Sequence, residues 1–292
     1  MEFDRSFDVL PGACVQVSPL VRRVLCGNAG PFTFKGTSTF IVGRGNVAII
    51  DPGPDDDTHL AALLTATRGE TISCVLITHT HADHSPLTGK LVAATGAKTF
   101  GYGPHGRGHD DDGPRLDASA DYGFMPDERM GHGDVVTGKG WTMEGVFTPG
   151  HTSNHLAFAL REEKALFIGD HVMAWATSVI APPDGNMGQY FASLKLLLDR
   201  DDTIYHPSHG ASRPDPLPLV RGYLAHRRMR EESIFRKVAE GMDNIERIVA
   251  AIYADVDPRL HGAAALSTLA HIAHLEEQGR IMRDGGVLRV TP

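Results

Sequence analysis

The chain has 292 residues, a hydrophobic content of 41% and a formal net charge of −8 at neutral pH. This composition is typical of a globular protein with a packed core, and the acidic balance argues against a general polyanion binder, although a local basic patch could still bind nucleic acid. No apolar run approaches the roughly 18 residues that span a membrane, and Met1–Arg5 lack a signal-peptide pattern. We therefore expect no membrane insertion and no export.

The number and spacing of the cysteines indicate the redox state of the cellular compartment. Cys14, Cys26 and Cys74 are far apart and form no Cys-x-x-Cys pair. An odd number of separated cysteines is typical of buried free thiols in a reducing environment. We expect neither a disulfide framework nor a thiolate zinc site, and a cytoplasmic location.

The first third of the chain predicts strands followed by alternating helices and strands. Segments rich in β-branched residues and separated by Gly-containing turns predict a β-meander over residues 21–25, 38–42 and 46–50. Asp51-Pro52-Gly53-Pro54 ends the last of these strands, and a helix is predicted over residues 58–68. The apolar strand 74–77 follows, and Ser85-Pro86 begins a helix that runs to about residue 95.

Residues 101–123 are rich in Gly, Asp and Pro and contain His105 and His109. This composition is typical of a solvated surface loop. The alternative is a lid or a substrate-facing insertion over a functional site.

The next part of the chain predicts further short strands. They are expected over residues 135–136, 143–147, 156–160, 165–168 and 203–205, with a helix over 189–198. Turns that carry His or Asp follow three of these strands. They are Thr148-Pro149-Gly150-His151-Thr152, Gly169-Asp170-His171 and His206-Pro207-Ser208-His209-Gly210.

A proline-rich segment at 213–218 marks a predicted domain boundary. The pattern beyond it predicts helices over 219–241, 244–254 and 263–278, then a hairpin over 279–290 with an Asp-Gly turn. Essentially all the negative excess lies before residue 213. We expect a catalytic domain over residues 1–212 and a winged-helix-like domain over 213–292.

The densest chemical signal is His79-Thr80-His81-Ala82-Asp83-His84, directly behind the strand 74–77. Histidine nitrogens with a carboxylate oxygen suit a divalent first-row metal. His79 and His81 project to the same side of an extended segment and can share one metal, whereas a turn would direct Asp83 and His84 toward a second. A two-metal centre needs more ligands, and the later turns offer His151, Asp170 and His209.

These motifs, in this order across residues 20–212, resemble the metallo-β-lactamase superfamily of αββα hydrolases. The segment 28–40, together with His226-Arg227 and the C-terminal helices and hairpin, is similar to a branch that adds a winged-helix-like domain and whose animal member is an endoribonuclease. This resemblance implies an α/β fold, the four-layered αββα sandwich of the metallo-β-lactamases, with a small C-terminal helical (winged-helix-like) domain.

Carried over residue by residue, the resemblance implies two divalent metal ions, zinc in the first place with Mn or Fe as alternatives. It implies that His79, His81 and His151 hold the first metal, that Asp83, His84 and His209 hold the second, and that Asp170 bridges them. Asp51 matches a carboxylate that orients a ligand histidine. The catalytic candidates are Asp83, Asp170 and His155, the last of which either supports a ligand or contacts substrate.

The chemistry predicted for such a centre is hydrolysis by a metal-bridging hydroxide. The acidic body favours a small ester, lactone or thioester as substrate. The branch resemblance favours the alternative, an endoribonuclease or phosphodiesterase acting on single-stranded RNA. A third hypothesis is a non-catalytic module that binds nucleic acid or dimerises, so the partners considered are a small molecule, RNA and a second copy of the chain.

Other polar residues have ordinary interpretations. The solitary histidines are expected at the surface or in the core: His105, His109, His132, His206, His226, His261, His271 and His274. The arginines of the first C-terminal helix predict a solvated, salt-bridged face, with a phosphate-binding track as the alternative: Arg221, Arg227, Arg228 and Arg230. Tyr205 is expected to pack at a strand end rather than act as a catalytic phenol.

Overall fold

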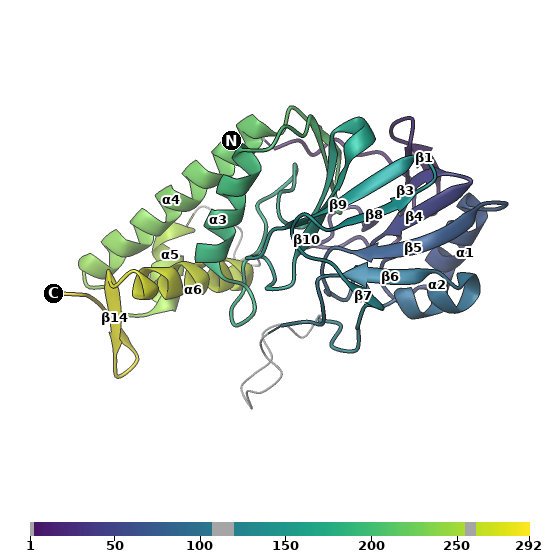
Figure 1. Ribbon diagram of the computed structural model, residues 1–292. Helices are drawn as coiled ribbons and strands as arrows, with labels where there is room; N and C mark the ends of the chain where they lie inside the picture. Colours follow the sequence, from purple (N-terminus) through teal and green to yellow (C-terminus); the bar gives the residue numbers. More distant parts are fainter. Residues whose placement is uncertain (1–2, 107–119, 255–260) are drawn as a thin grey trace.

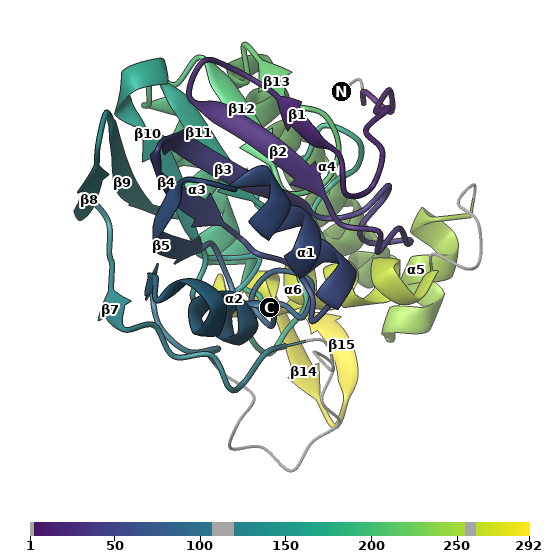
Figure 2. The same ribbon diagram turned by 90° about the vertical axis from the view of Figure 1, so that its right-hand side faces the viewer.

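Two β-sheets lie face to face, and helices cover the outer face of each, as Figures 1 and 2 show. This arrangement comes from a computed structural model that describes residues 3–106, 120–254 and 261–292. The αββα sandwich expected from the sequence is confirmed.

The first sheet contains seven strands in sequence order. They are β1 (Cys14–Gln16), β2 (Val21–Leu25), β3 (Ser38–Arg44), β4 (Asn46–Ile50), β5 (Thr71–Ile77), β6 (Lys98–Gly101) and β7 (Glu128–Arg129). Strands β2, β3 and β4 form the predicted antiparallel meander, and β4, β5 and β6 are parallel. The sequence did not reveal β1, β6 or β7. These strands are only two to four residues long, and β1 and β7 are exposed, so none of the three gives a clear apolar pattern.

The second sheet contains six strands in the order β13-β12-β11-β10-β9-β8. They are β8 (Val135–Gly138), β9 (Trp141–Phe147), β10 (Leu156–Leu160), β11 (Ala165–Gly169), β12 (Ile204–Pro207) and β13 (Arg213–Pro214). The short 3-10 helix Arg161–Glu163 closes the predicted hairpin of β10 and β11. Because β11 and β12 are parallel, their carboxyl ends lie side by side, and the N–H of Ser208 donates to the carbonyl of Gly169 at 3.1 Å.

A hydrophobic core fills the space between the sheets. Phe40 of the first sheet meets the edge of Phe167 of the second with 5.1 Å between ring centroids, and Phe158 is buried beside them. On the outer faces, α1 (Asp57–Ala66) and α2 (Thr88–Thr95) cover the first sheet, and α3 (Met187–Leu198) covers the second. The rigid scaffold therefore carries the loops at one end of both sheets.

Two helix starts differ from the prediction. The carboxylate of Asp56 caps α1 by accepting from the N–H groups of Thr58 and His59, so the helix begins at residue 57. Helix α2 begins at Thr88 rather than at Ser85-Pro86. The reason is that the N–H of Leu87 donates to the carbonyl of Gly53 at 3.1 Å, which holds this segment in a turn.

The C-terminal helices and hairpin form a smaller core of their own. They are α4 (Leu217–Ala239), α5 (Ile245–Ile252), α6 (His261–Glu277), β14 (Ile281–Asp284) and β15 (Val287–Val290). The first half of α4 packs with α3 through Leu219 and Tyr223, whereas its second half enters the C-terminal core through Ile234. Strand β13 also pairs with β12, so the expected boundary after residue 212 does not separate two independent cores.

All three cysteines are free. Cys26 and Cys74 are buried as predicted, but the prediction of a buried thiol is wrong for Cys14, because the edge strand β1 exposes it to solvent. Within the part of the chain that the structure describes, we found no helix with the length and hydropathy required to cross a membrane.

Candidate metal centre

Seven side chains converge where the carboxyl ends of β5, β9, β11 and β12 meet. His79, His81, Asp83 and His84 lie in the turn after β5, while His151, Asp170 and His209 follow β9, β11 and β12. Hydrogen bonds between sheets hold these turns together, since the N–H of Leu156 donates to the carbonyl of Thr78 at 2.7 Å. The structure thus brings together all seven residues that the resemblance implied.

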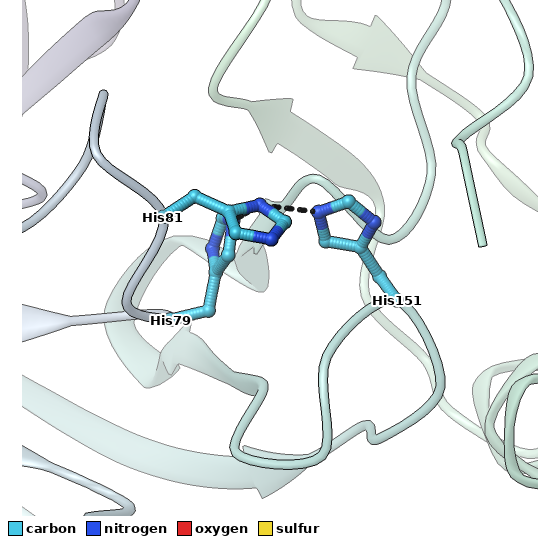
Figure 3. Close-up of side chains that lie close together, drawn as sticks. All are labelled: His79, His81 and His151. Atoms are coloured by element: carbon cyan, nitrogen blue, oxygen red, sulfur yellow. Dashed lines mark hydrogen bonds between the residues drawn. The ribbon is translucent and has the colours of Figure 1, made fainter. Parts of the chain in front are cut away.

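Three histidines form the first group. His79, His81 and His151 point their rings toward a common centre, as Figure 3 shows, and each offers one nitrogen within 4.8 Å of the others. Nδ1 of His81 lies 3.0 Å from Nε2 of His79 and 3.1 Å from Nε2 of His151. Two ligand atoms bound tetrahedrally at about 2.0–2.1 Å from one metal are about 3.3 Å apart, so this spacing fits a shared ion.

Asp83, His84 and His209 form the second group. Oδ2 of Asp83 lies 3.3 Å from Nε2 of His84 and 3.2 Å from Nε2 of His209. This group combines two imidazole nitrogens with one carboxylate oxygen, a donor set that zinc and other first-row ions accept.

Asp170 lies between the two groups. Its Oδ1 is 3.3 Å from Nε2 of His209, and its Oδ2 is 3.7 Å from Nε2 of His84 and 3.8 Å from Nε2 of His151. One carboxylate therefore approaches both groups, which is the position that a bridging ligand requires.

Atoms without hydrogen-bond partners give an independent test of fit. Nε2 of His84 and Oδ1 of Asp170 are among the buried polar atoms of the described residues that have no hydrogen-bond partner. Buried polar atoms are rarely left unsatisfied, and both atoms point into the cluster where a cation would be coordinated. The donor set and these two atoms together fit a pair of divalent ions.

The second nitrogen of each of three ligand histidines has a carbonyl or carboxylate oxygen as its partner. Nδ1 of His151 lies 2.6 Å from the carbonyl oxygen of Val179, and Nδ1 of His209 lies 3.2 Å from that of Gly36. Nδ1 of His84 lies 3.0 Å from Oδ2 of Asp51. Such contacts fix the tautomer and the ring orientation of metal-binding histidines.

Asp51 is placed as the resemblance implied, beside a ligand histidine. Asp51, His79 and His84 also come close enough to hold an ion. However, the Asp51 carboxylate already accepts from the N–H of Thr78 at 2.8 Å and from its hydroxyl at 2.6 Å. These bonds favour a supporting role for Asp51 over direct coordination.

The electrostatics of the two groups differ. Burial, reinforced by neighbouring histidines, holds the pKa of His79 well below its usual range and lowers the pKa of His151 to about 4. Burial alone would also lower the pKa of His209, but the carboxylates of Asp170 and Asp83 outweigh it and raise this pKa to about 10. His79 and His151 therefore present neutral nitrogens, whereas the carboxylates of Asp83 and Asp170 favour positive charge beside His209, which a bound cation would supply.

His155 and Tyr205 do not line the site. His155 is fully buried, with Nδ1 2.9 Å from the hydroxyl of Thr148, and its ring centroid is 5.2 Å from that of His79. This position is compatible with support of the ligand histidines and not with contact to a substrate. Tyr205 packs in the core beside α3, as expected for a strand-end residue.

Arg227 contradicts the prediction for the first C-terminal helix. Its side chain is 3% exposed, and its guanidinium donates to the carbonyl of Ser178, so it lies neither on a solvated face nor on a phosphate track. Arg221 and Arg228 are exposed as expected, and Arg230 lies over the ring of Tyr253.

Most of the solitary histidines lie where the sequence suggested. His132 is exposed and His226 is half-buried, whereas His206, His271 and His274 make hydrogen bonds inside the protein. His109 lies outside the described residues, as does the side chain of His261.

Both described ends of the predicted 101–123 loop are attached to the turn that carries His79 and His81. His105 is buried, with Nδ1 2.9 Å from the hydroxyl of Thr80, and the N–H of Asp121 donates to the carbonyl of Thr80 at 2.7 Å. The loop therefore leaves from and returns to the metal centre. Residues 107–119, on which the lid alternative depends, lie outside the described residues.

A cavity of about 420 Å³ opens onto the metal centre. Its lining includes five of the seven candidate ligands: His81, Asp83, His151, Asp170 and His209. Apolar side chains from distant parts of the chain form the rest of the wall, and they include Phe32, Met173, Val179, Ala181 and Leu266. No spacing or motif identifies these residues in the sequence, because only the tertiary fold brings the loop after β2, the loop after β11 and helix α6 together.

Comparison with known proteins agrees with this geometry. Residues 32–209 match the Metallo-beta-lactamase superfamily, and residues 245–288 match the beta-lactamase associated winged helix domain. The chain belongs to the Metallo-beta-lactamase superfamily. It is therefore a hydrolase fold with an attached winged helix domain, and both expectations from the sequence are confirmed.

Individual relatives within the superfamily cover most of the chain. The Beta-lactamase-like protein 2 homolog of Drosophila melanogaster is 27% identical over 283 residues, which are 92% of each protein. The Atrochrysone carboxyl ACP thioesterase AgnL7 of Paecilomyces divaricatus is 30% identical over 250 residues, covering 85% of this chain and 73% of that protein. A Beta-lactamase domain protein from Burkholderia ambifaria has the same fold, with a TM-score of 0.79 at 21% identity over 99% of this chain and 96% of that one.

Proposed function

We propose that this superfamily member is a dinuclear metal-dependent thioester hydrolase that acts on a small molecule with an apolar acyl group. The observation that carries the proposal is the cavity, in which metal-binding residues form one side and apolar side chains the other. Relatives named Atrochrysone carboxyl ACP thioesterase support the thioester among the three substrate classes considered.

The wall of the cavity favours a neutral, apolar substrate over RNA. Phe32, Met173 and Leu266 contribute apolar surface, and no Lys or Arg is among the described residues that line the cavity. Recognition of an RNA backbone relies on cationic side chains close to the phosphates. The burial of Arg227 removes one of the four arginines that the RNA hypothesis placed on the surface of this helix.

We propose zinc as the metal at both positions, with Mn or Fe as alternatives. His79, His81 and His151 would hold one ion, Asp83, His84 and His209 the other, and Asp170 would contact both. Divalent ions bound there would polarise the thioester carbonyl and lower the pKa of water toward neutrality.

Asp83 is the candidate for moving the proton. Its side chain is 25% exposed and faces the cavity, whereas that of Asp170 is 10% exposed. Although burial opposes ionisation, His84 and His209 hold the pKa of Asp83 well below its usual range, so its side chain is an ionised carboxylate that can accept a hydrogen bond from the attacking water. Asp83 would take a proton from the attacking water and return it to the sulfur of the leaving thiol. The hydroxyl of Thr37 donates to Oδ2 of Asp83 at 3.2 Å and helps to orient it.

A substrate panel tests the proposal. The metal-loaded protein would be offered acyl thioesters with apolar chains, lactones, simple esters, phosphodiesters and single-stranded RNA, with Asp170→Ala as the control. We expect turnover of the thioesters that is lost in the variant. Cleavage of RNA without thioester turnover would replace this proposal with the endoribonuclease alternative, and inactivity toward every class would favour the non-catalytic hypothesis.

We also propose a cellular location and an oligomeric state for the enzyme. A cytoplasmic location is proposed from the three free cysteines, which are typical of a reducing compartment. A homodimer is the assembly considered, and sedimentation of the metal-loaded protein would test it.

A further inference from the structure

We propose that Arg227 of helix α4 is a positioning residue for the metal centre, through which the C-terminal part of the chain holds Asp170 and His151 in place. The proposal rests on the proposed dinuclear centre but not on the thioester substrate. It concerns the segment from Asp170 to Val179, which leaves β11 and forms part of the cavity wall.

The environment of Arg227 is unusual for a cation. Its guanidinium is buried 5.3 Å from the centroid of the Tyr190 ring and donates to the carbonyl of Ser178, and its Nε has no hydrogen-bond partner. In the described part of the chain, Arg227 makes no ion pair with a carboxylate. A buried charge without an opposite charge costs stability, so this arginine is not explained by packing alone.

Ser178 connects Arg227 to the bridging candidate. The Ser178 hydroxyl lies 2.5 Å from the carbonyl oxygen of Asp170 and 2.9 Å from that of His171. Ser178 therefore contacts the backbone of the turn that carries Asp170, and the carbonyl of Ser178 accepts a hydrogen bond from Arg227.

The next residue connects Arg227 to the first group of histidines. The carbonyl oxygen of Val179 lies 2.6 Å from Nδ1 of His151, the nitrogen that faces away from the metal position. Ser178 and Val179 are consecutive, so Arg227 restrains a backbone segment on which both Asp170 and His151 depend. Asp170 lies between the two groups and His151 belongs to the first, so their relative position decides whether the Asp170 carboxylate can reach both ions.

The rest of the segment has its own attachments. The hydroxyl of Tyr223 donates to the carbonyl of Met173 at 2.7 Å, and the hydroxyl of Tyr190 donates to that of His171 at 2.6 Å. Removing the Arg227 guanidinium should therefore loosen the part around Ser178 without detaching the whole loop. The expected defect is in metal geometry rather than in folding.

The test uses metal binding rather than turnover. Arg227→Met, Arg227→Lys and the exposed neighbour Arg228→Met would be stripped of metal and titrated with Zn²⁺ against a chromophoric chelator, and thermal melting of the metal-free proteins would be recorded. We expect Arg227→Met to bind at least one of the two ions about 10–100-fold more weakly, as for other contacts that orient ligands. Arg227→Lys should recover part of the loss, and Arg228→Met should match the parent.

Ser178→Ala provides a second variant. It deletes the hydroxyl that contacts the carbonyl of Asp170 and leaves the buried charge of Arg227 in place. This variant should also weaken metal binding. If Arg227→Met does not fold, Ser178→Ala alone tests whether this contact positions the metal ligands. Parent-like affinity for both ions in folded Arg227→Met, or in Ser178→Ala, overturns the proposal. If the parent protein binds no Zn²⁺, the dinuclear centre itself is refuted. If the parent binds two ions and the variants bind them equally well, only the role of Arg227 is refuted.

Discussion

Oδ2 of Asp51 lies 3.0 Å from Nδ1 of His84, and the same carboxylate accepts both hydrogen bonds from Thr78 at the start of the ligand turn. Asp51 therefore orients a ligand ring and fixes the backbone from which the other ligands project. Its backbone has a positive φ of 49°, in the left-handed region that Asp and Asn tolerate better than most residues.

Asp51→Asn should weaken metal binding without unfolding the protein. Asn keeps the size and the backbone preference of Asp but removes the negative charge that polarises His84. We expect a loss of metal affinity of about 10–100-fold, measured by Zn²⁺ titration. Asp57→Asn, at an exposed position of α1, is the control and should behave as the parent. Equal affinities in all three proteins would contradict the role assigned to Asp51.

Removing Asp170 should cost more activity than removing the buried His155. Asp170 contacts both groups of ligands, so Asp170→Ala should reduce kcat/KM by more than about 100-fold, beyond the effect of a supporting contact. His155→Gln keeps a polar group near Thr148 and should retain most of the activity. Steady-state kinetics on a thioester compares them, and equal losses would count against a bridging Asp170.

Metal content provides the most direct check of the centre. Elemental analysis of protein purified without chelator should approach about two divalent ions per chain. Chelation should also lower the melting temperature, because ions that bind only the folded state stabilise it by mass action. A content near zero after supplementation with Zn²⁺, Mn²⁺ or Fe²⁺ would contradict the ligand assignment.

Leu266 should influence substrate choice although it lies in the C-terminal part of the chain. Leu266→Ala removes apolar surface from the cavity wall and should raise KM for thioesters with long apolar acyl chains by about 10-fold, with a smaller effect on acetyl thioesters. Met229→Ala, at an exposed position of α4, is the matched control. A uniform fall in kcat across all chain lengths would indicate a structural defect instead of a role in specificity.

Acid should destabilise the protein below pH 6.5, partly through His59. Burial lowers the pKa of His59 to about 4 from its usual 6.5, so the unfolded state binds the proton more readily than the folded state. The contribution to stability is present above pH 6.5 and is lost as the pH falls toward 4, to a total of about 3 kcal/mol.

Urea unfolding at pH 7.5 and pH 5 would measure this effect. The loss of unfolding free energy between the two values should be about 2 kcal/mol smaller in His59→Gln than in the parent. His132→Gln, at an exposed position, should leave the difference unchanged. An equal pH dependence in His59→Gln and the parent would show that His59 is not responsible.

The ligands were predictable from the sequence because their signal is local. Four of them lie within His79–His84, and the other three follow strands in short turns with familiar motifs. The strands themselves were predictable where burial on both faces gives continuous apolar runs, as in β10.

Other features depend on contacts between distant segments and left no such signal. Arg227 lies in a helix rich in alternating charges, so its burial against Tyr190 follows only from the way α4 packs on α3. Leu266 is one of many apolar residues of α6, and nothing local distinguishes it as part of the cavity wall. Cys14 is exposed because β1 is an edge strand, which three residues of sequence do not reveal.

Helix α4 contributes Leu219 and Tyr223 to one core and Ile234 to the other. A helix shared in this way couples the unfolding of the two units, since neither core can lose it and remain intact. The winged helix domain therefore cannot be exchanged or removed like an independent module without disturbing the hydrolase. A substitution in α4 should therefore change the stability of both units together.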